Sequence, residues 1–209
     1  RFEPRPPDAL PATPRPKPTP EPYVENQPLL RELAFPLGET LEYKVTSAGQ
    51  ETGKFVLQAK ERKLIQNIDT LVLTAKATSI TTNNKPFALG DALTARVNPD
   101  TLAPMAFEMK FLGQLASFNQ TAAFDLRTGA ITAGTAKVDS PVGTHSLLSL
   151  IYAMRSFNLK PSKDSTNPVN DTRVAVFWSD KTYIFVLRPN DVEFLTINGE
   201  KVPAQMIAI

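Results

Sequence analysis

Few side chains in this sequence have the types and spacing that covalent or metal chemistry requires. The 209 residues include no cysteine and a single histidine, His145. The lack of cysteine excludes disulfides, thiolate catalysis and iron–sulfur ligation, and one imidazole cannot build the two- or three-histidine sites that bind zinc. We therefore expect no metal site, no cofactor and no catalytic residue.

His145 is the one imidazole available as a general base, and it stands beside Ser146 and near Ser149. A serine nucleophile of the hydrolase type would need a Gly-x-Ser-x-Gly turn, which the chain lacks. We expect a local hydrogen bond for His145 instead. The carboxylates that a glycosidase could use stand mostly at predicted strand ends or turns, where Asp commonly caps its own backbone. They are Glu39, Asp91, Asp100, Asp125 and Glu193. The sequence thus predicts a protein that is not an enzyme, and a hydrolase is the least favoured hypothesis.

Arg155 lies towards the end of an otherwise apolar segment. A guanidinium that faces a core needs a partner, because an unpaired buried charge is strongly destabilising. Three interpretations are open. Arg155 reaches solvent with its stem along the apolar face, forms an ion pair with Glu39, or binds a substrate anion.

The charge balance sets limits on partners. The chain has 23 Lys and Arg against 21 Asp and Glu, a net charge of +2. Binding to a polyanion needs a local surplus of basic side chains, so we expect no nucleic-acid partner. No run of 18 apolar residues is present, so any membrane attachment would come from an anchor upstream of Arg1.

The elements that position these residues fall into two regions. Ten of the nineteen prolines lie between Pro4 and Pro28, which predicts a disordered, extended Pro-rich linker over residues 1–28. Such an arm is typical of a tether, and it could also serve as a PxxP ligand. Residues 29–209 form the predicted domain, in which short runs of Val, Ile, Thr, Phe and Tyr alternate with turn signals.

The predicted fold is mainly β: a single strongly curved antiparallel sheet, a β-roll or half-barrel, with one buried helix. The helix spans 145–158, where apolar residues recur at helical spacing over a wide arc. Asn198-Gly199 is the clearest hairpin signal. The predicted strands are 39–48, 54–61, 70–80, 92–97, 103–112, 117–126, 130–138, 172–178, 182–188, 192–197 and 201–207.

Two stretches are similar to a known family. Residues 35–43, Phe-Pro-Leu-Gly-Glu-Thr-Leu-Glu-Tyr, followed by Gly-Lys-Phe at 53–55, resemble the opening of the bacterial exported domain-of-unknown-function family 3108. The segment 146–155 resembles that family's helix, which begins with serine and ends with tyrosine and arginine. The resemblance covers about residues 35–209 and implies a rolled β domain in an exported protein. The family's motifs include residues that match Gly38, Tyr43 and Tyr152, as well as Glu39 and Arg155. The resemblance implies no catalytic role for any of them.

These observations give our functional hypothesis. We expect a periplasmic or extracellular, non-enzymatic β-domain that binds a hydrophobic ligand, a lipid or acyl chain, or a partner, at a concave sheet surface. Glu39, Tyr43, Tyr152 and Arg155, called the polar cluster below, are its candidate ligand-binding or structural residues. The alternative is a scaffold component of a cell-envelope assembly that uses an edge strand and the Pro-rich arm to hold an envelope protein.

Overall fold

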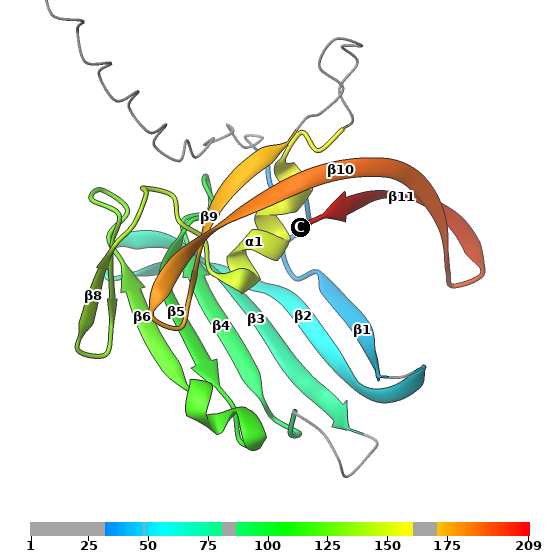
Figure 1. Cartoon of the computed structure of the whole chain (residues 1–209), viewed down its shortest axis with the longest axis horizontal. Helices are drawn as coiled ribbons and strands as arrows, with labels where there is room; N and C mark the ends of the chain where they lie inside the picture. Colours follow the sequence, from blue (N-terminus) through cyan, green and yellow to red (C-terminus); the bar gives the residue numbers. More distant parts are fainter. Residues whose placement is uncertain (1–31, 48, 81–86, 161–170) are drawn as a thin grey trace, which may run out of the picture.

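A computed structural model describes residues 32–47, 49–80, 87–160 and 171–209. The predicted linker, residues 1–28, lies outside this part of the chain. The described part is mainly β, with two antiparallel sheets and one α-helix between them (Figure 1). The prediction of a mainly β fold with a buried helix is therefore confirmed.

The larger sheet is a meander of eight strands, in which each strand pairs with the next along the chain. Its strands are β1 Thr40–Ser47, β2 Gln50–Ile65, β3 Ile68–Ile80, β4 Ala92–Val97, β5 Pro104–Lys110, β6 Gln120–Phe124, β7 Ala130–Ala133 and β8 Ala136–Asp139. A short 3₁₀ helix, η1 Gln114–Phe118, joins β5 to β6. Short connections with turn residues make pairing between neighbouring antiparallel strands the simplest arrangement.

Alternation along the strands separates the two faces of this sheet. In β4, Ala95 and Val97 are fully buried while Arg96 is exposed. The inner face, which the helix covers, carries the apolar set because successive side chains of a strand point to opposite sides. The outer face carries the charged and hydroxyl residues.

The smaller sheet contains β9 Thr172–Trp178, β10 Lys181–Ile197 and β11 Glu200–Ala208, in the order β11-β10-β9. Strand β9 pairs with residues 181–187 of β10, and β11 pairs with residues 188–197. The outer half of β10 and β11 therefore form a two-stranded ribbon that extends past β9, as Figure 1 shows. Its turn is Asn198-Gly199, both at positive φ, as the hairpin signal predicted.

The prediction of a single sheet was wrong. Strands β9 to β11 form a separate sheet, and two predicted strands, 182–188 and 192–197, merge into the one long strand β10. A helix that is apolar over a wide arc needs cover on two sides, and here two separate sheets supply it in place of one curved sheet. The predicted strong curvature is not confirmed, since neither sheet is closed or strongly curled.

The helix is also shorter than the predicted 145–158. Helix α1 spans Leu147–Ala153 and tightens into a 3₁₀ turn, η2 Met154–Ser156. Ser146 is the N-cap, and its side chain and that of Ser149 form a reciprocal capping box. His145 is extended, because its backbone N–H and C=O bond to Ala175 and Phe177 of β9.

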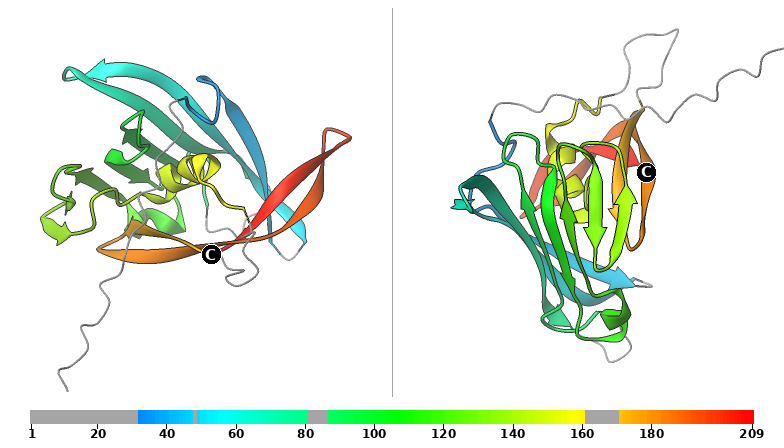
Figure 2. Two further views of the ribbon diagram at one scale, coloured as in Figure 1. Left: turned by 90° about the horizontal axis from the view of Figure 1, so that it is seen from above. Right: turned by 90° about the vertical axis from the view of Figure 1, so that its left-hand side faces the viewer.

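Helix α1 lies between the two sheets (Figure 2). The core has two parts, and α1 contributes to both. Leu148, Tyr152 and Ala153 pack against the larger sheet. Leu150 packs against Val174, Val176 and Leu187 of the smaller sheet. The helix thus joins the two sheets and positions one wall of the cavity described next.

Candidate functional site

An apolar cavity lies on the inner face of the larger sheet, beside the start of α1. Its volume is about 390 Å³. We call it the inner cavity. Its lining comes from β2, β4, the β3–β4 connection, the end of β5, η1, α1 and β9. The lining residues are Phe55, Phe87, Asp91, Ala92, Leu93, Phe111, Leu115, Phe118, Leu147 and Trp178.

Aromatic rings form half of this lining. Phe55 and Phe87 meet edge to face with their centroids 4.9 Å apart. Phe118 and Trp178 lie 6.3 Å apart, at a tilt. Phe118 is 42% exposed, and Trp178 is partly buried against the core. Rings that stay partly accessible on the inner face of a sheet are available to contact an apolar ligand.

Asp91 is the single ionisable residue among these lining side chains. It is fully buried, and its two carboxylate oxygens accept hydrogen bonds from the backbone N–H groups of Ala88, at 2.8 Å, and Leu112, at 2.7 Å. These bonds tie the β3–β4 connection to the end of β5. Asp91 therefore holds the rim of the inner cavity together and leaves the lining apolar.

The residues of the polar cluster lie at the start of β1 and the end of α1, where Tyr152 and Arg155 interact electrostatically with Glu39 and Tyr43. The Arg155 guanidinium forms a two-bond ion pair with the Glu39 carboxylate: Nη1 donates to Oε2, and Nη2 donates to Oε1 at 2.9 Å. The side chains are 34% and 13% exposed, so the pair is partly buried, and its hydrogen bonds raise the pKa of Arg155. The ion-pair interpretation of Arg155 is confirmed. The Arg155 guanidinium also lies 5.2 Å from the centre of the Phe35 ring.

Tyr152 packs against the same Phe35 ring that Arg155 approaches. Its side chain is buried, its ring meets Phe35 edge to face at 4.8 Å, and its hydroxyl has no hydrogen-bond partner among the described residues. Burial, reinforced by the negative charge of Glu39, raises the pKa of Tyr152 to about 12. The hydroxyl is therefore protonated at all physiological pH values.

Tyr43 completes the cluster from β1 and is 48% exposed. Its electrostatic interaction with Tyr152 and Arg155 also raises the pKa of both side chains. Tyr43 is also the register partner of Phe55, whose side chain lines the inner cavity. The polar cluster is thus a neighbour of the inner cavity, and none of its four residues belongs to the lining.

The sequence analysis did not identify the residues that line the inner cavity. The signal available was the placement of phenylalanine on the inward positions of the strands, as at Phe55 and Phe111. Alternation shows which face a residue occupies, but it does not show whether the facing space is filled, because that depends on residues from seven different elements.

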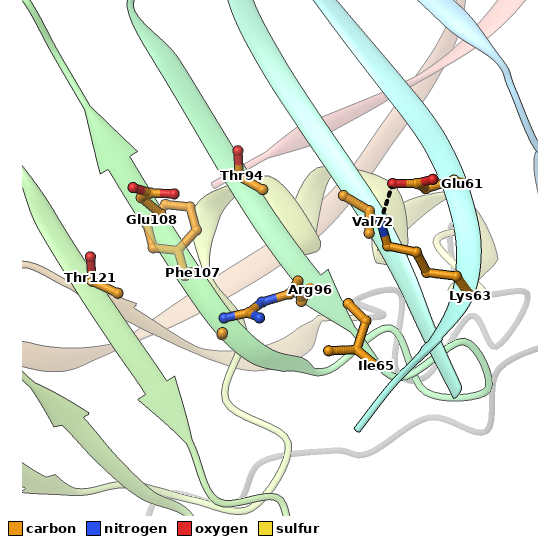
Figure 3. A pocket seen from close by; sticks show the side chains of 10 residues that line it. Glu61, Lys63, Ile65, Val72, Thr94, Arg96, Phe107, Glu108 and Thr121 are labelled. Atoms are coloured by element: carbon orange, nitrogen blue, oxygen red, sulfur yellow. Dashed lines mark hydrogen bonds and ion pairs between the residues drawn. The ribbon is translucent and has the colours of Figure 1, made fainter. Parts of the chain in front are cut away.

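A second hollow lies on the outer face of the larger sheet, with a volume of about 400 Å³ (Figure 3). Its chemistry is the opposite of the first. Arg96, Glu108 and hydroxyls line it, and Lys63 is paired with Glu61 at 2.6 Å. Small side chains in register with Arg96, such as Ala106, leave the space open. A mixed-charge, open hollow of this kind does not suit a hydrophobic ligand.

His145 is buried between α1 and β9. Its Nδ1 lies 3.1 Å from the Ser149 hydroxyl, the local hydrogen bond that the sequence predicted. Burial lowers the pKa of His145 from 6.5 to about 4. The imidazole is therefore neutral near pH 7.

Within the described ranges, no three His, Cys, Asp or Glu side chains gather closely enough to hold a metal ion, and no helix is long and apolar enough to cross a membrane. No family model matches the chain, and no curated protein or solved structure is similar to it at a significant level. The similarity to the exported family therefore remains an expectation from the residues quoted above.

Proposed function

We propose that this protein is a non-enzymatic, exported binding domain that holds a hydrophobic molecule in the inner cavity. The observation that carries the proposal is the cavity's lining, which joins five aromatic rings and three leucines from both sheets and the helix. In this proposal the ligand lies between the inner face of the larger sheet and a wall formed by α1 and β9.

The size of the cavity supports a ligand with a single chain or a small ring system. A volume of about 390 Å³ falls in the lower part of the range for small-molecule sites, about 300–1,000 Å³. Since one water occupies about 30 Å³ in the liquid, the cavity has room for about a dozen methylene-sized groups. That is the length of a medium acyl chain.

Trp178 makes a direct test possible, because it is the chain's one tryptophan and it lines the inner cavity. The probe is N-phenyl-1-naphthylamine, an uncharged dye that brightens in apolar surroundings and accepts energy from tryptophan. We expect saturable dye binding with quenching of Trp178 emission, and displacement of the dye by dodecanol. A dye that stays dark, or one that binds without quenching Trp178, would contradict the proposal.

A matched pair of variants locates the binding. Leu115→Asp places a carboxylate on the cavity wall, whereas Leu64→Asp places the same group at a site that is 70% exposed on β2, away from the cavity. We expect at least about a tenfold loss of dye affinity for Leu115→Asp, because an unpartnered carboxylate beside the bound dye must be desolvated, and no loss for Leu64→Asp. Thermal unfolding of both variants confirms that they fold.

The ribbon of β10 and β11 favours the second candidate function, a scaffold component of a cell-envelope assembly. Phe194 and Leu195 are neighbours on opposite faces of the ribbon, and both are exposed, at 68% and 46%. β11 is also the edge strand of its sheet and pairs only with β10 among the described residues. Cross-linking in cells separates the two functions, because a scaffold gives one dominant protein adduct and a carrier gives transient ones.

A further inference from the structure

We infer that the ligand of the inner cavity is uncharged, a long-chain alcohol, ester or hydrocarbon, and that anionic fatty acids are selected against. This inference rests on the proposed function and adds the chemical class of the ligand. It is carried by the charges that surround the inner cavity. The lining brings one ionisable side chain, the carboxylate Asp91, and no Lys, Arg or His from the described residues.

A fatty acid places its carboxylate near the mouth of the site that holds its chain. Stable binding of that carboxylate needs a cation or several N–H donors, because burial of an unpaired charge is strongly unfavourable. The two backbone N–H groups nearest to Asp91, those of Ala88 and Leu112, already donate to the Asp91 carboxylate. Asp91 therefore uses these donors and adds a negative charge of its own.

Among the described residues, the lysines close to the inner cavity in sequence or register are directed elsewhere. Lys76 and Lys110 both pair with Ala92 across the sheet and are exposed. Their side chains belong to the outer face, since Leu93, the next residue along β4, belongs to the inner one. Lys181, the register partner of Trp178, has its Nζ 5.4 Å from the centre of the Tyr183 ring. Arg155 is held by Glu39, outside the lining.

The test compares three ligands with the same chain length: dodecanol, methyl dodecanoate and dodecanoate, each below its aggregation limit at pH 8. Displacement of N-phenyl-1-naphthylamine from the full chain gives the three affinities. We expect the alcohol and the ester to bind at least about tenfold more tightly than the anion, a difference of about 1.4 kcal/mol. If the anion binds as tightly as the alcohol, the inference is overturned and the proposed function stands. If none of the three displaces the dye, the proposed function fails as well.

A second experiment uses a variant that is expected to gain affinity for the anion. Phe118→Lys introduces a cation at the exposed rim of the inner cavity, and Leu64→Lys introduces the same charge on the distant end of β2. We expect Phe118→Lys to reduce the preference for the alcohol over the anion to about threefold or less, since it supplies the missing partner. Leu64→Lys should retain the full preference. An unchanged preference in Phe118→Lys, or an equal change in Leu64→Lys, would count against the charge argument.

Discussion

At the scale of single residues, the polar cluster combines an ion pair with a buried hydroxyl that has no hydrogen-bond partner among the described residues. Glu39 and Arg155 satisfy each other through two hydrogen bonds, 116 residues apart in sequence. The Tyr152 hydroxyl, beneath them, is buried without a partner in the described part of the chain. A buried polar atom of this kind reduces stability, because it loses its hydrogen bonds to water and gains none.

Tyr152→Phe tests this assignment. We expect the free energy of unfolding to stay the same or rise by about 1 kcal/mol, because the substitution removes an unsatisfied hydroxyl and keeps the ring against Phe35. Tyr152→Ala should lower it by about 3–5 kcal/mol, because it empties a fully buried site. Urea unfolding of both variants measures these changes. A loss of more than about 1 kcal/mol in Tyr152→Phe would show that the hydroxyl has a partner and a structural role.

At the scale of elements, the outer half of β10 and its partner β11 differ from the central strands. Strand β3 pairs with β2 on one side and with β4 on the other, and its residues 70–75 are buried. The ribbon has one pairing partner per strand and little cover on either face. Strands with few buried contacts open locally at a low free-energy cost.

Amide hydrogen exchange should show this difference directly. We expect the protected amides of residues 71–75 to exchange only through global unfolding, and those of residues 192–197 to exchange at least about 100-fold faster, since each factor of ten corresponds to about 1.4 kcal/mol in opening free energy. Equal protection of the two segments would mean that the ribbon is covered in solution. That result would favour the scaffold function over the carrier.

At the scale of the whole molecule, one buried residue joins the smaller sheet to the helix. His145 pairs with β9 through its backbone, and its ring bonds Ser149 of α1 and lies 6.3 Å from Phe157. Its pKa is about 4 in the fold, against 6.5 for an ordinary histidine. Between these values the unfolded chain binds a proton that the folded chain excludes, so stability falls as the pH falls.

We therefore expect His145 to contribute a loss of about 2 kcal/mol in the free energy of unfolding between pH 7 and pH 5. The contribution is absent above about pH 7.5 and levels off below about pH 3.5, where both states are protonated. Chemical unfolding across this range measures it. His145→Asn, which removes the titrating group, should flatten the profile by that amount, and a profile of unchanged slope would assign the acid sensitivity to other groups.

The sequence by itself determined the elements and some of their contacts. Alternation and turn chemistry predicted the antiparallel strands and the Asn198-Gly199 hairpin, because both depend on neighbours in the chain. The apolar arc of the segment after His145 predicted a buried helix, and the need of a buried Arg155 for a partner made an ion pair with Glu39 one of three interpretations. Both follow from the cost of exposing apolar surface or burying an unpaired charge, which holds in any fold.

Only the tertiary structure decided how these elements divide into two sheets and where a space remains between them. A helix with apolar residues on two sides predicts cover, but it does not specify whether one curved sheet or two sheets supply it. The inner cavity depends on side chains from seven elements, such as Phe55, Leu147 and Trp178, that are far apart in sequence. Its volume and the lack of a cation among its described lining residues result from packing in three dimensions, which local patterns along the chain do not record.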